Sequence, residues 1–198
     1  MLFSKEDIET KMQTIQAEGQ PSAFTSQYLN WSVEKINNAD GLLRLPEDGE
    51  AIFLQTIQSF NAFSLVEMLS RQQFIQELVA TTYSVSLSVL EALQELRSIG
   101  RLGSVTLLIS DSMQQRNPRV CNAINAWAET NPDVKIIYTW NHSKITLAKT
   151  EIGYYCIEGS GNWSKNAQYE QYVFLQSQQV HQFRKELMDN CKIIHQIN

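Results

Sequence analysis

His142 and Lys144 are the two residues of this 198-residue chain whose types and spacing best suit the binding of an anion. They lie two positions apart in a segment that is predicted to form one long strand, 134–148. Alternate residues of a strand point to the same face, so both side chains are expected to leave the sheet together. An imidazole and an ammonium held side by side repel when both are charged, and a bound anion relieves that repulsion.

A second polar group follows in the loop Gly159–Asn162, whose sequence is Gly-Ser-Gly-Asn. Ser160 offers a hydroxyl and Asn162 an amide, and the glycines allow a tight turn with the backbone close to a ligand. The loop follows a predicted strand, 152–159, which can pair with the preceding strand through a hairpin. This pairing is expected to bring the serine and the asparagine close to Lys144.

Taken in order, these residues resemble the HKD motif of the phospholipase D superfamily. The resemblance rests on His142-x-Lys144, on Gly159-Ser160-Gly161-Asn162, and on Glu170 before the apolar run "YVFL". The order of elements from about Glu50 onward is also similar to one repeat of that fold, over roughly three quarters of the chain. Lys149 departs from the pattern, because it occupies the position of the motif acid, in a predicted turn beyond the His/Lys pair.

The resemblance implies a phosphodiesterase that needs neither a metal nor another cofactor. His142 attacks phosphorus and forms a covalent phosphohistidine, because a neutral imidazole is nucleophilic at working pH. Lys144 and Asn162 hold the non-bridging phosphate oxygens. Ser160 adds a hydroxyl donor, and Glu170 orients the imidazole through its other ring nitrogen. The candidate substrate contacts are Gly159, Gly161, Lys149 and Lys165.

This mechanism requires two histidines, one as nucleophile and one as acid for the leaving group, but the sequence holds one such motif. His181 and His195 lie in a predicted C-terminal helix, 180–197, and neither has a lysine two residues later. The resemblance therefore implies a homodimer, in which two copies of the motif face each other across a two-fold axis.

Two segments with different patterns make up the chain. Residues 1–49 are expected to form a helical N-terminal extension, with predicted helices at 4–19 and 25–41. Pro46 and Gly49 mark the boundary to a phospholipase D-like domain, 50–198, in which strands and helices alternate. Such alternation favours an α/β fold with a central mixed, largely parallel sheet flanked by helices.

Composition limits where the protein acts and with what it associates. No apolar run approaches the length of a membrane helix, and the N-terminus turns charged at once, so we expect a cytoplasmic protein without stable membrane insertion. The three cysteines are widely spaced and predict neither disulfides nor a zinc site. The net charge of −5 comes from residues 1–75, so the half that carries the motif is neutral and can hold a local basic groove.

Three functions fit these observations. The first is a nuclease acting on DNA or RNA, for which the candidate phosphate contacts are Arg116, Arg119, Lys135 and Lys165. The second is a phospholipid phosphodiesterase, which would need an exposed apolar rim around the site; the aromatic residues near the motif are Trp140, Tyr154, Tyr155 and Trp163. The third is a nucleic-acid-binding module with reduced or lost catalysis, motivated by Lys149.

Overall fold

In the described residues, nine strands form one central sheet with the strand order β1-β2-β8-β7-β6-β3-β4-β5-β9. The computed structural model describes residues 30–36, 44–56, 61–166 and 169–198. The strands are β1 (Asn30–Ile36), β2 (Glu50–Thr56), β3 (Ile75–Thr82), β4 (Leu102–Ser110), β5 (Val134–Thr139), β6 (Ile145–Thr150), β7 (Tyr154–Gly159), β8 (Gln171–Gln176) and β9 (His195–Ile197).

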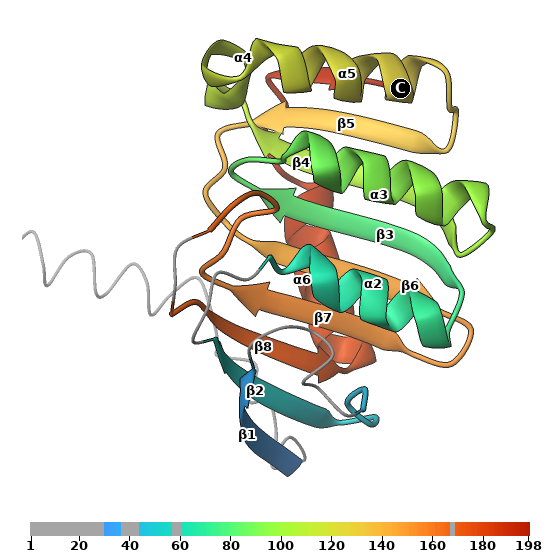
Figure 1. The fold of residues 1–198 in the computed structure, drawn as a ribbon, viewed down its shortest axis with the longest axis vertical. Helices are drawn as coiled ribbons and strands as arrows, with labels where there is room; N and C mark the ends of the chain where they lie inside the picture. Colours follow the sequence, from blue (N-terminus) through green and yellow to red (C-terminus); the bar gives the residue numbers. More distant parts are fainter. Residues whose placement is uncertain (1–29, 37–43, 57–60, 167–168) are drawn as a thin grey trace, which may run out of the picture.

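Helices cover both faces of this sheet, which confirms the predicted α/β architecture. Three of them, α2 (Phe63–Gln72), α3 (Leu87–Ser98) and α5 (Pro118–Glu129), lie on one face, and α6 (Gln178–Asp189) crosses the other (Figure 1). A short helix, α4 (Ser112–Arg116), precedes α5. The helices start where local chemistry favours a start: Ser86 and Ser177 accept backbone N–H groups at the beginnings of α3 and α6, and Pro118 opens α5.

The sheet is mixed, but the prediction that it is largely parallel is wrong. Only β1–β2, β3–β4 and β4–β5 pair in parallel, and the other five neighbouring pairs are antiparallel. Parallel neighbouring strands need a long crossover connection, which is usually a helix. No helix connects β5 to β6 or β6 to β7. These short connections reverse the chain direction each time, so β6 runs against β3 and β7 runs against β6.

The predicted long strand 134–148 is two strands that do not touch. β5 pairs with β4, whereas β6 pairs with β3 and β7, and residues 140–144 form the connection between them. His142 and Lys144 therefore lie in a loop and not on a strand. The hairpin between β6 and β7 is confirmed.

Two predicted helices also differ from the structure. The segment 25–41 contains β1, which pairs in parallel with β2, while the rest of that segment and the predicted helix 4–19 lie outside the described residues. The C-terminal helix ends at Asp189, and His195 lies on β9. The division at residue 49 stays a prediction, with β1 joined to the sheet of the following domain.

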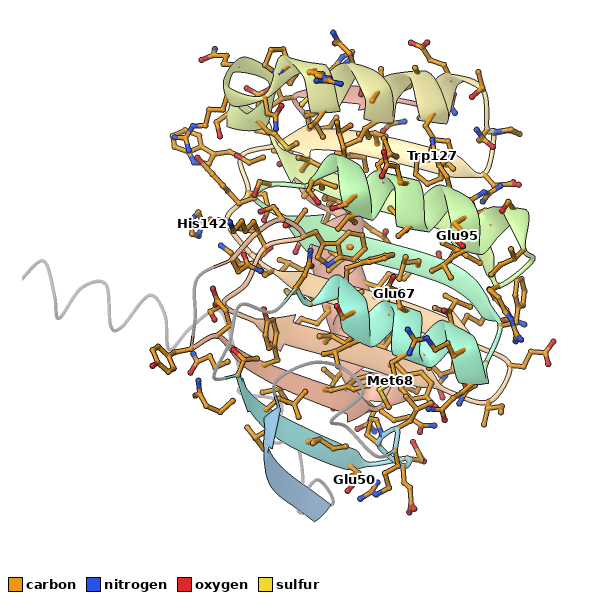
Figure 2. The ribbon with its side chains drawn as sticks, viewed as in Figure 1. Glu50, Glu67, Met68, Glu95, Trp127 and His142 are labelled. Carbon is orange, nitrogen blue, oxygen red and sulfur yellow. The ribbon has the colours of Figure 1, made fainter. Side chains whose placement is uncertain are left out.

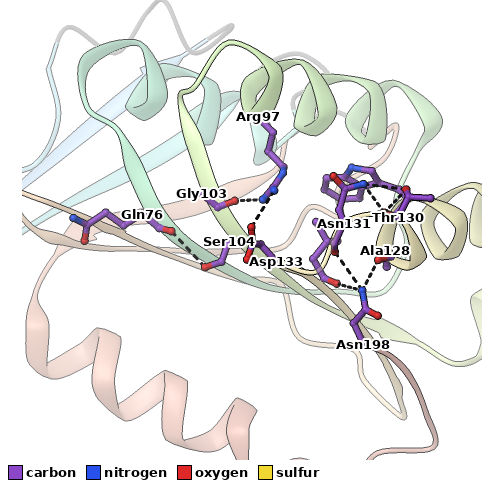
Figure 3. Close-up of polar contacts among 11 residues, drawn as sticks. Gln76, Arg97, Gly103, Ser104, Ala128, Thr130, Asn131, Asp133 and Asn198 are labelled. Carbon is purple, nitrogen blue, oxygen red and sulfur yellow. Dashed lines mark hydrogen bonds and ion pairs between the residues drawn. The ribbon is translucent and has the colours of Figure 1, made fainter.

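The core has two parts, one on each face of the sheet. The larger cluster fills the space between the sheet and α2, α3 and α5, and a smaller one lies under α6 around Leu147, Cys156 and Met188. At the amino ends of β4 and β5, polar contacts close the fold (Figure 3): Arg97 donates to the carbonyl of Gly103 and pairs with Asp133 at 3.6 Å, and Asn198 donates to the Val134 carbonyl. The opposite, carboxyl ends of these strands are left for the polar residues of the motif.

Candidate functional site

The loop 140–144 carries His142 at the edge of the molecule, beyond the carboxyl ends of β3 and β5 (Figure 2). Asn141 anchors this loop, because its amide donates to the carbonyls of Thr82 and Leu108, each at 3.4 Å. The side-chain oxygen of Asn141 also accepts the backbone N–H of Ser143 at 2.9 Å. The loop is thus tied to the ends of β3 and β4, and His142 stays exposed between its anchored neighbours.

Lys144 turns back onto His142, so the predicted pair is formed although neither residue is on a strand. The Lys144 Nζ atom lies 2.9 Å from Nδ1 of His142 and 2.6 Å from the backbone oxygen of His142. Lys144 is half-buried, and burial lowers the pKa of its ammonium, while the negative charge of Glu170 opposes this shift. The charge of Glu170 therefore acts on the same site as the His/Lys pair.

Asn162 is held by the segment that follows β3. Its side-chain oxygen accepts the backbone N–H of Tyr83 at 3.1 Å and lies 3.5 Å from the Thr82 hydroxyl. Because that oxygen faces an N–H group, the amide nitrogen is the end left for a ligand, and it donates to no atom of the described residues. The free donor is what binding of a phosphate oxygen requires.

Trp163 fixes the position of Asn162 from the other side. Its side chain is 1 % exposed and packs edge-on against Phe63, with ring centroids 5.2 Å apart. Its backbone N–H donates to the Thr82 hydroxyl at 3.1 Å, and its carbonyl accepts the N–H of Ser86. Trp163 is therefore a core residue that locks the loop after β7 onto the end of β3.

Ser160 and Glu170 contact each other, which differs from the predicted partnership of Glu170 with His142. The Ser160 hydroxyl donates to the Glu170 carboxylate and accepts the N–H of Gln171 at 3.1 Å. The backbone N–H of Glu170 donates to the Thr56 hydroxyl at 2.9 Å, which fixes the start of β8. The negative charge of Glu170 acts on Lys144. Within the described residues, the Glu170 carboxylate makes no contact with His142.

The two glycines of the motif loop are needed for packing. A Cβ on Gly159 or on Gly161 would collide with the Tyr172 side chain, which is buried below the loop. Neither glycine has a positive φ, so space, not backbone freedom, dictates their identity. Lys165 is exposed at the far end of the same loop.

Lys149 is not brought to this site. It lies on β6, five residues beyond Lys144, which is about 16 Å along a strand. It is paired with Tyr154 across the hairpin, and its ammonium lies 5.9 Å from the Tyr154 ring centroid. The prediction that Lys149 lies in a turn is wrong.

The remaining histidines have separate surroundings. His181 is buried on α6 against Tyr154, and burial lowers its pKa to about 4. His195 stacks on Tyr138, with ring centroids 6.0 Å apart. Neither ring contacts His142 in the described part of the chain. The candidate phosphate contact Lys135 is on β5 and lines a depression beside α6, and Arg119 is exposed at the start of α5.

A pocket of about 380 Å³, which we call the strand-end pocket, adjoins His142. Its wall includes Tyr83, Asp111, Ser112, Gln115, Trp140 and His142. The Tyr83 ring lies 5.1 Å from the His142 ring and 5.1 Å from the Arg116 guanidinium, and its hydroxyl accepts a hydrogen bond from Ser112 at 3.1 Å. Tyr83, Asp111 and Ser112 are not part of the motif predicted from the sequence. Their position could have indicated a role in binding, since they follow the carboxyl ends of parallel strands, where ligands bind in open α/β sheets.

The described ranges hold neither a cluster of metal ligands nor a membrane-spanning helix. Within them, no group of three or more His, Cys, Asp or Glu side chains is arranged to hold a metal ion, and Cys121, Cys156 and Cys191 are free thiols. Of the helices that the structure describes, none has the length and hydrophobicity needed to cross a membrane.

Comparisons with known proteins show similarity in structure only. No protein-family model matches the chain, and no curated protein matches its sequence. Phosphatidylserine synthase from Haemophilus influenzae Rd KW20 is similar at a TM-score of 0.51 and 13 % identity, covering 73 % of this chain and 40 % of that protein. This chain therefore spans less than half of that protein, and the similarity shows a shared α/β fold.

Two further solved structures are similar at lower scores. Polyphosphate kinase from Porphyromonas gingivalis has a TM-score of 0.48 and 14 % identity, over 65 % of this chain and 24 % of that protein. TrmBL2, a DNA-binding archaeal chromatin protein, has a TM-score of 0.45 and 13 % identity, over 93 % of this chain and 60 % of that protein.

Proposed function

We propose that this chain is a member of the phospholipase D superfamily and a metal-independent phosphodiesterase that cleaves nucleic acid in the cytoplasm. The observation that supports this most is the position of two hydrogen-bond donors for a phosphate, Lys144 and Asn162, near the His142 imidazole. Lys144 Nζ lies 2.9 Å from His142 Nδ1, and Tyr83 joins this pair to Asn162, because its ring contacts His142 and its backbone N–H binds the Asn162 side chain.

In the first step, an imidazole nitrogen of His142 attacks phosphorus, and the bond between phosphorus and the leaving oxygen breaks. The leaving oxygen takes a proton from a general acid and departs as an alcohol. Lys144 and Asn162 bind the non-bridging oxygens, where negative charge must be stabilised in the transition state. In the second step, water attacks phosphorus, the P–N bond breaks, and the water proton returns to the group that acted as acid.

The general acid in this proposal is His142 of a second copy of the chain. His181 is unsuited to the role because it is buried against Tyr154, and His195 is stacked on Tyr138. A homodimer with its two-fold axis near His142 supplies both histidines, and its interface repeats the same surface on both subunits. Sedimentation of the full chain as a monomer at micromolar concentration would rule out this composite site.

Glu170 has a modified role in this proposal. Its carboxylate accepts a hydrogen bond from Ser160 and opposes the effect of burial on Lys144. It therefore keeps Lys144 charged for phosphate binding and holds Ser160 in place. Lys165 is proposed as an outer contact to the nucleic-acid backbone because it is exposed on the motif loop. We retain no substrate contact for Lys149, which lies elsewhere on β6.

A phospholipid substrate is the second candidate. Phosphatidylserine synthase shares the fold, and two apolar side chains next to the pocket, Trp140 and Ile194, are exposed as a membrane-contacting rim requires. The other aromatic residues near the motif do not extend this rim, because Trp163 and Tyr155 are buried and Tyr154 lies at the amino end of β7.

One assay separates these candidates. Single-stranded DNA, double-stranded DNA, RNA and phosphatidylcholine vesicles are each incubated with the protein in the presence of a chelator. The wild type is compared with His142→Ala and with His195→Ala, which removes another exposed histidine as a matched control. We expect nucleic-acid cleavage that His142→Ala abolishes and His195→Ala retains. If the substrate phosphate carries a label, no label should stay on the wild-type protein after acid treatment, because phosphohistidine hydrolyses in acid. Cleavage that persists in His142→Ala rejects the mechanism, and binding without cleavage in the wild type identifies a binding module.

A further inference from the structure

We propose that the strand-end pocket binds an unstacked nucleobase next to the phosphate that Lys144 and Asn162 bind and His142 attacks, with Trp140 as the stacking surface. This inference rests on the proposed function and specifies its substrate class as single-stranded nucleic acid. It is carried by the exposure of Trp140, by the polar wall of the pocket and by the position of both beside His142.

Trp140 is the most exposed large apolar side chain among the described residues, at 95 %. By contrast, Trp127 and Trp163 are 6 % and 1 % exposed. An indole left in water forgoes the stabilisation that its burial would supply, so an exposed indole beside a polar pocket is suited to a ligand that covers it. Trp140 precedes His142 by two residues in the anchored loop 140–144, so a group stacked on it lies close to the attacked phosphate.

The wall of the pocket is suited to a planar polar group. Asp111 offers a carboxylate, Ser112 a hydroxyl and Gln115 an amide, and all three line the pocket that Trp140 borders. A nucleobase combines a face that stacks on an aromatic ring with an edge of hydrogen-bonding groups. An acyl chain would cover these polar side chains without pairing them, which is unfavourable. A volume of about 380 Å³ is within the usual range of small-molecule pockets.

Charge places the base and the phosphates in different parts of the site. The Asp111 carboxylate, held by the Gln114 amide at 2.6 Å, disfavours a second phosphate inside the pocket and accepts a hydrogen bond from a base amino or imino group. Arg116 lies outside it, with its guanidinium 5.1 Å from the Tyr83 ring, and is exposed where the backbone of an adjacent nucleotide can reach it. A base inside a duplex is stacked and paired on both sides, so only a single strand or an extruded nucleotide can fill the pocket.

The test measures binding without turnover, in the full-length His142→Ala protein. Fluorescence anisotropy compares a single-stranded DNA with a strand of equal length whose central nucleotides are abasic, both at one fixed salt concentration. The same pair is then measured after adding Trp140→Ala, Trp140→Phe or Ile152→Ala. Ile152 is a matched control, because it is also an exposed apolar side chain, at 73 %, but lies in the turn between β6 and β7 at the other end of the sheet.

We expect the intact strand to bind at least about fivefold more tightly than the abasic strand, since stacking of a base on an aromatic side chain has an effect of this order. Trp140→Ala should remove this preference, Trp140→Phe should keep most of it, and Ile152→Ala should leave it unchanged. Equal binding of both strands before the Trp140 substitution, or a preference that survives Trp140→Ala, overturns the base pocket.

Two further outcomes separate this inference from the proposed function. If the base preference follows Trp140 but the wild type cuts no phosphodiester, the pocket stands and the nuclease proposal falls. If Trp140→Ala weakens binding to phosphatidylcholine vesicles and leaves the strand preference intact, the pocket inference is overturned and Trp140 belongs to a lipid-facing rim.

Discussion

The Nζ atom of Lys144 lies 2.9 Å from Nδ1 of His142 and also donates to the His142 backbone oxygen at 2.6 Å. An ammonium can only donate, so Nδ1 accepts and the neutral imidazole carries its proton on Nε2. For Nε2 to attack phosphorus, that proton must move to Nδ1, and Lys144 must leave it. In the proposed mechanism, a phosphate oxygen would provide the new partner for the ammonium, so substrate binding and activation of the nucleophile would be coupled.

Replacement of Lys144 tests this coupling. Lys144→Met should lower kcat/KM about 10²- to 10³-fold, because a charged donor to the phosphate is lost. Lys144→Arg should retain part of the activity, since the positive charge remains but the guanidinium cannot follow the same path from Nδ1 to phosphate. Lys192→Met, which removes an exposed lysine in the segment after α6, serves as the control and should leave the rate unchanged. Wild-type kinetics in Lys144→Met would remove Lys144 from the mechanism.

Asn162 offers a substitution that separates binding of substrate from stability. Asn162→Asp keeps the oxygen that accepts the Tyr83 N–H but replaces the free amide nitrogen with a negative oxygen. We expect a loss of activity of about 10²-fold or more with less than about 1 kcal/mol of destabilisation. Asn162→Ala should lose activity and also about 1–3 kcal/mol, because the Tyr83 N–H loses its partner.

The control for Asn162 is Asn125, which lies on α5. Its side-chain oxygen accepts a hydrogen bond from the Tyr138 hydroxyl at 2.8 Å. Asn125→Asp makes the same chemical change and should leave activity intact. Activity and urea-unfolding curves of all three variants provide the measurement. If Asn162→Asp is as active as the wild type, the amide nitrogen does not hold phosphate.

Hydrophobic patterns predicted the order of elements well but could not show how the strands pair. The run from Val134 to Ala148 is apolar enough for one strand, and its break at residues 140–144 depends on β3 and β4 lying between its two halves. In the segment around β1, Leu29, Val33 and Ile36 fit helical spacing, while Trp31 and Val33 alternate as in a strand. Pairing with β2 decides between these patterns, and local sequence carries no information on that contact.

The site was predictable where residues are close in sequence and unpredictable where the sheet brings distant segments together. His142 and Lys144 meet because they lie two residues apart in one short loop, and Asn162 follows them through a hairpin. Tyr83, which directly follows β3 and precedes His142 by about 60 residues, contacts both His142 and Asn162. Glu170 binds Ser160 because the end of β7 lies beside the start of β8, a neighbour relation that the motif alone does not contain.

Gly161 is expected to be essential for stability, because the Tyr172 side chain occupies the place of its missing Cβ. Gly161→Ala should cost about 1–3 kcal/mol of the free energy of unfolding, as overpacking does elsewhere. The nearest atom is the Tyr172 hydroxyl oxygen, so adding Tyr172→Phe should recover part of the loss. A double-mutant cycle in urea measures this recovery, and strictly additive effects would show that the two residues do not compete for space.

His181 should make the folded state sensitive to mild acid. Burial lowers its pKa to about 4, from an ordinary value near 6.5, so the unfolded chain binds a proton more readily than the folded one between these values. Stability should therefore fall as the pH drops from about 7.5 to about 4, by up to about 3 kcal/mol, and should lose no more from this group at lower pH. The surroundings contain both signs of charge: Glu77 favours protonation, whereas Lys185 and Lys149 oppose it.

Urea unfolding of His181→Leu tests this prediction. The free energy of unfolding should differ less between pH 7.5 and pH 5 in this variant than in the wild type. An equal pH dependence in both proteins would assign the acid sensitivity between pH 7.5 and pH 5 to groups other than His181.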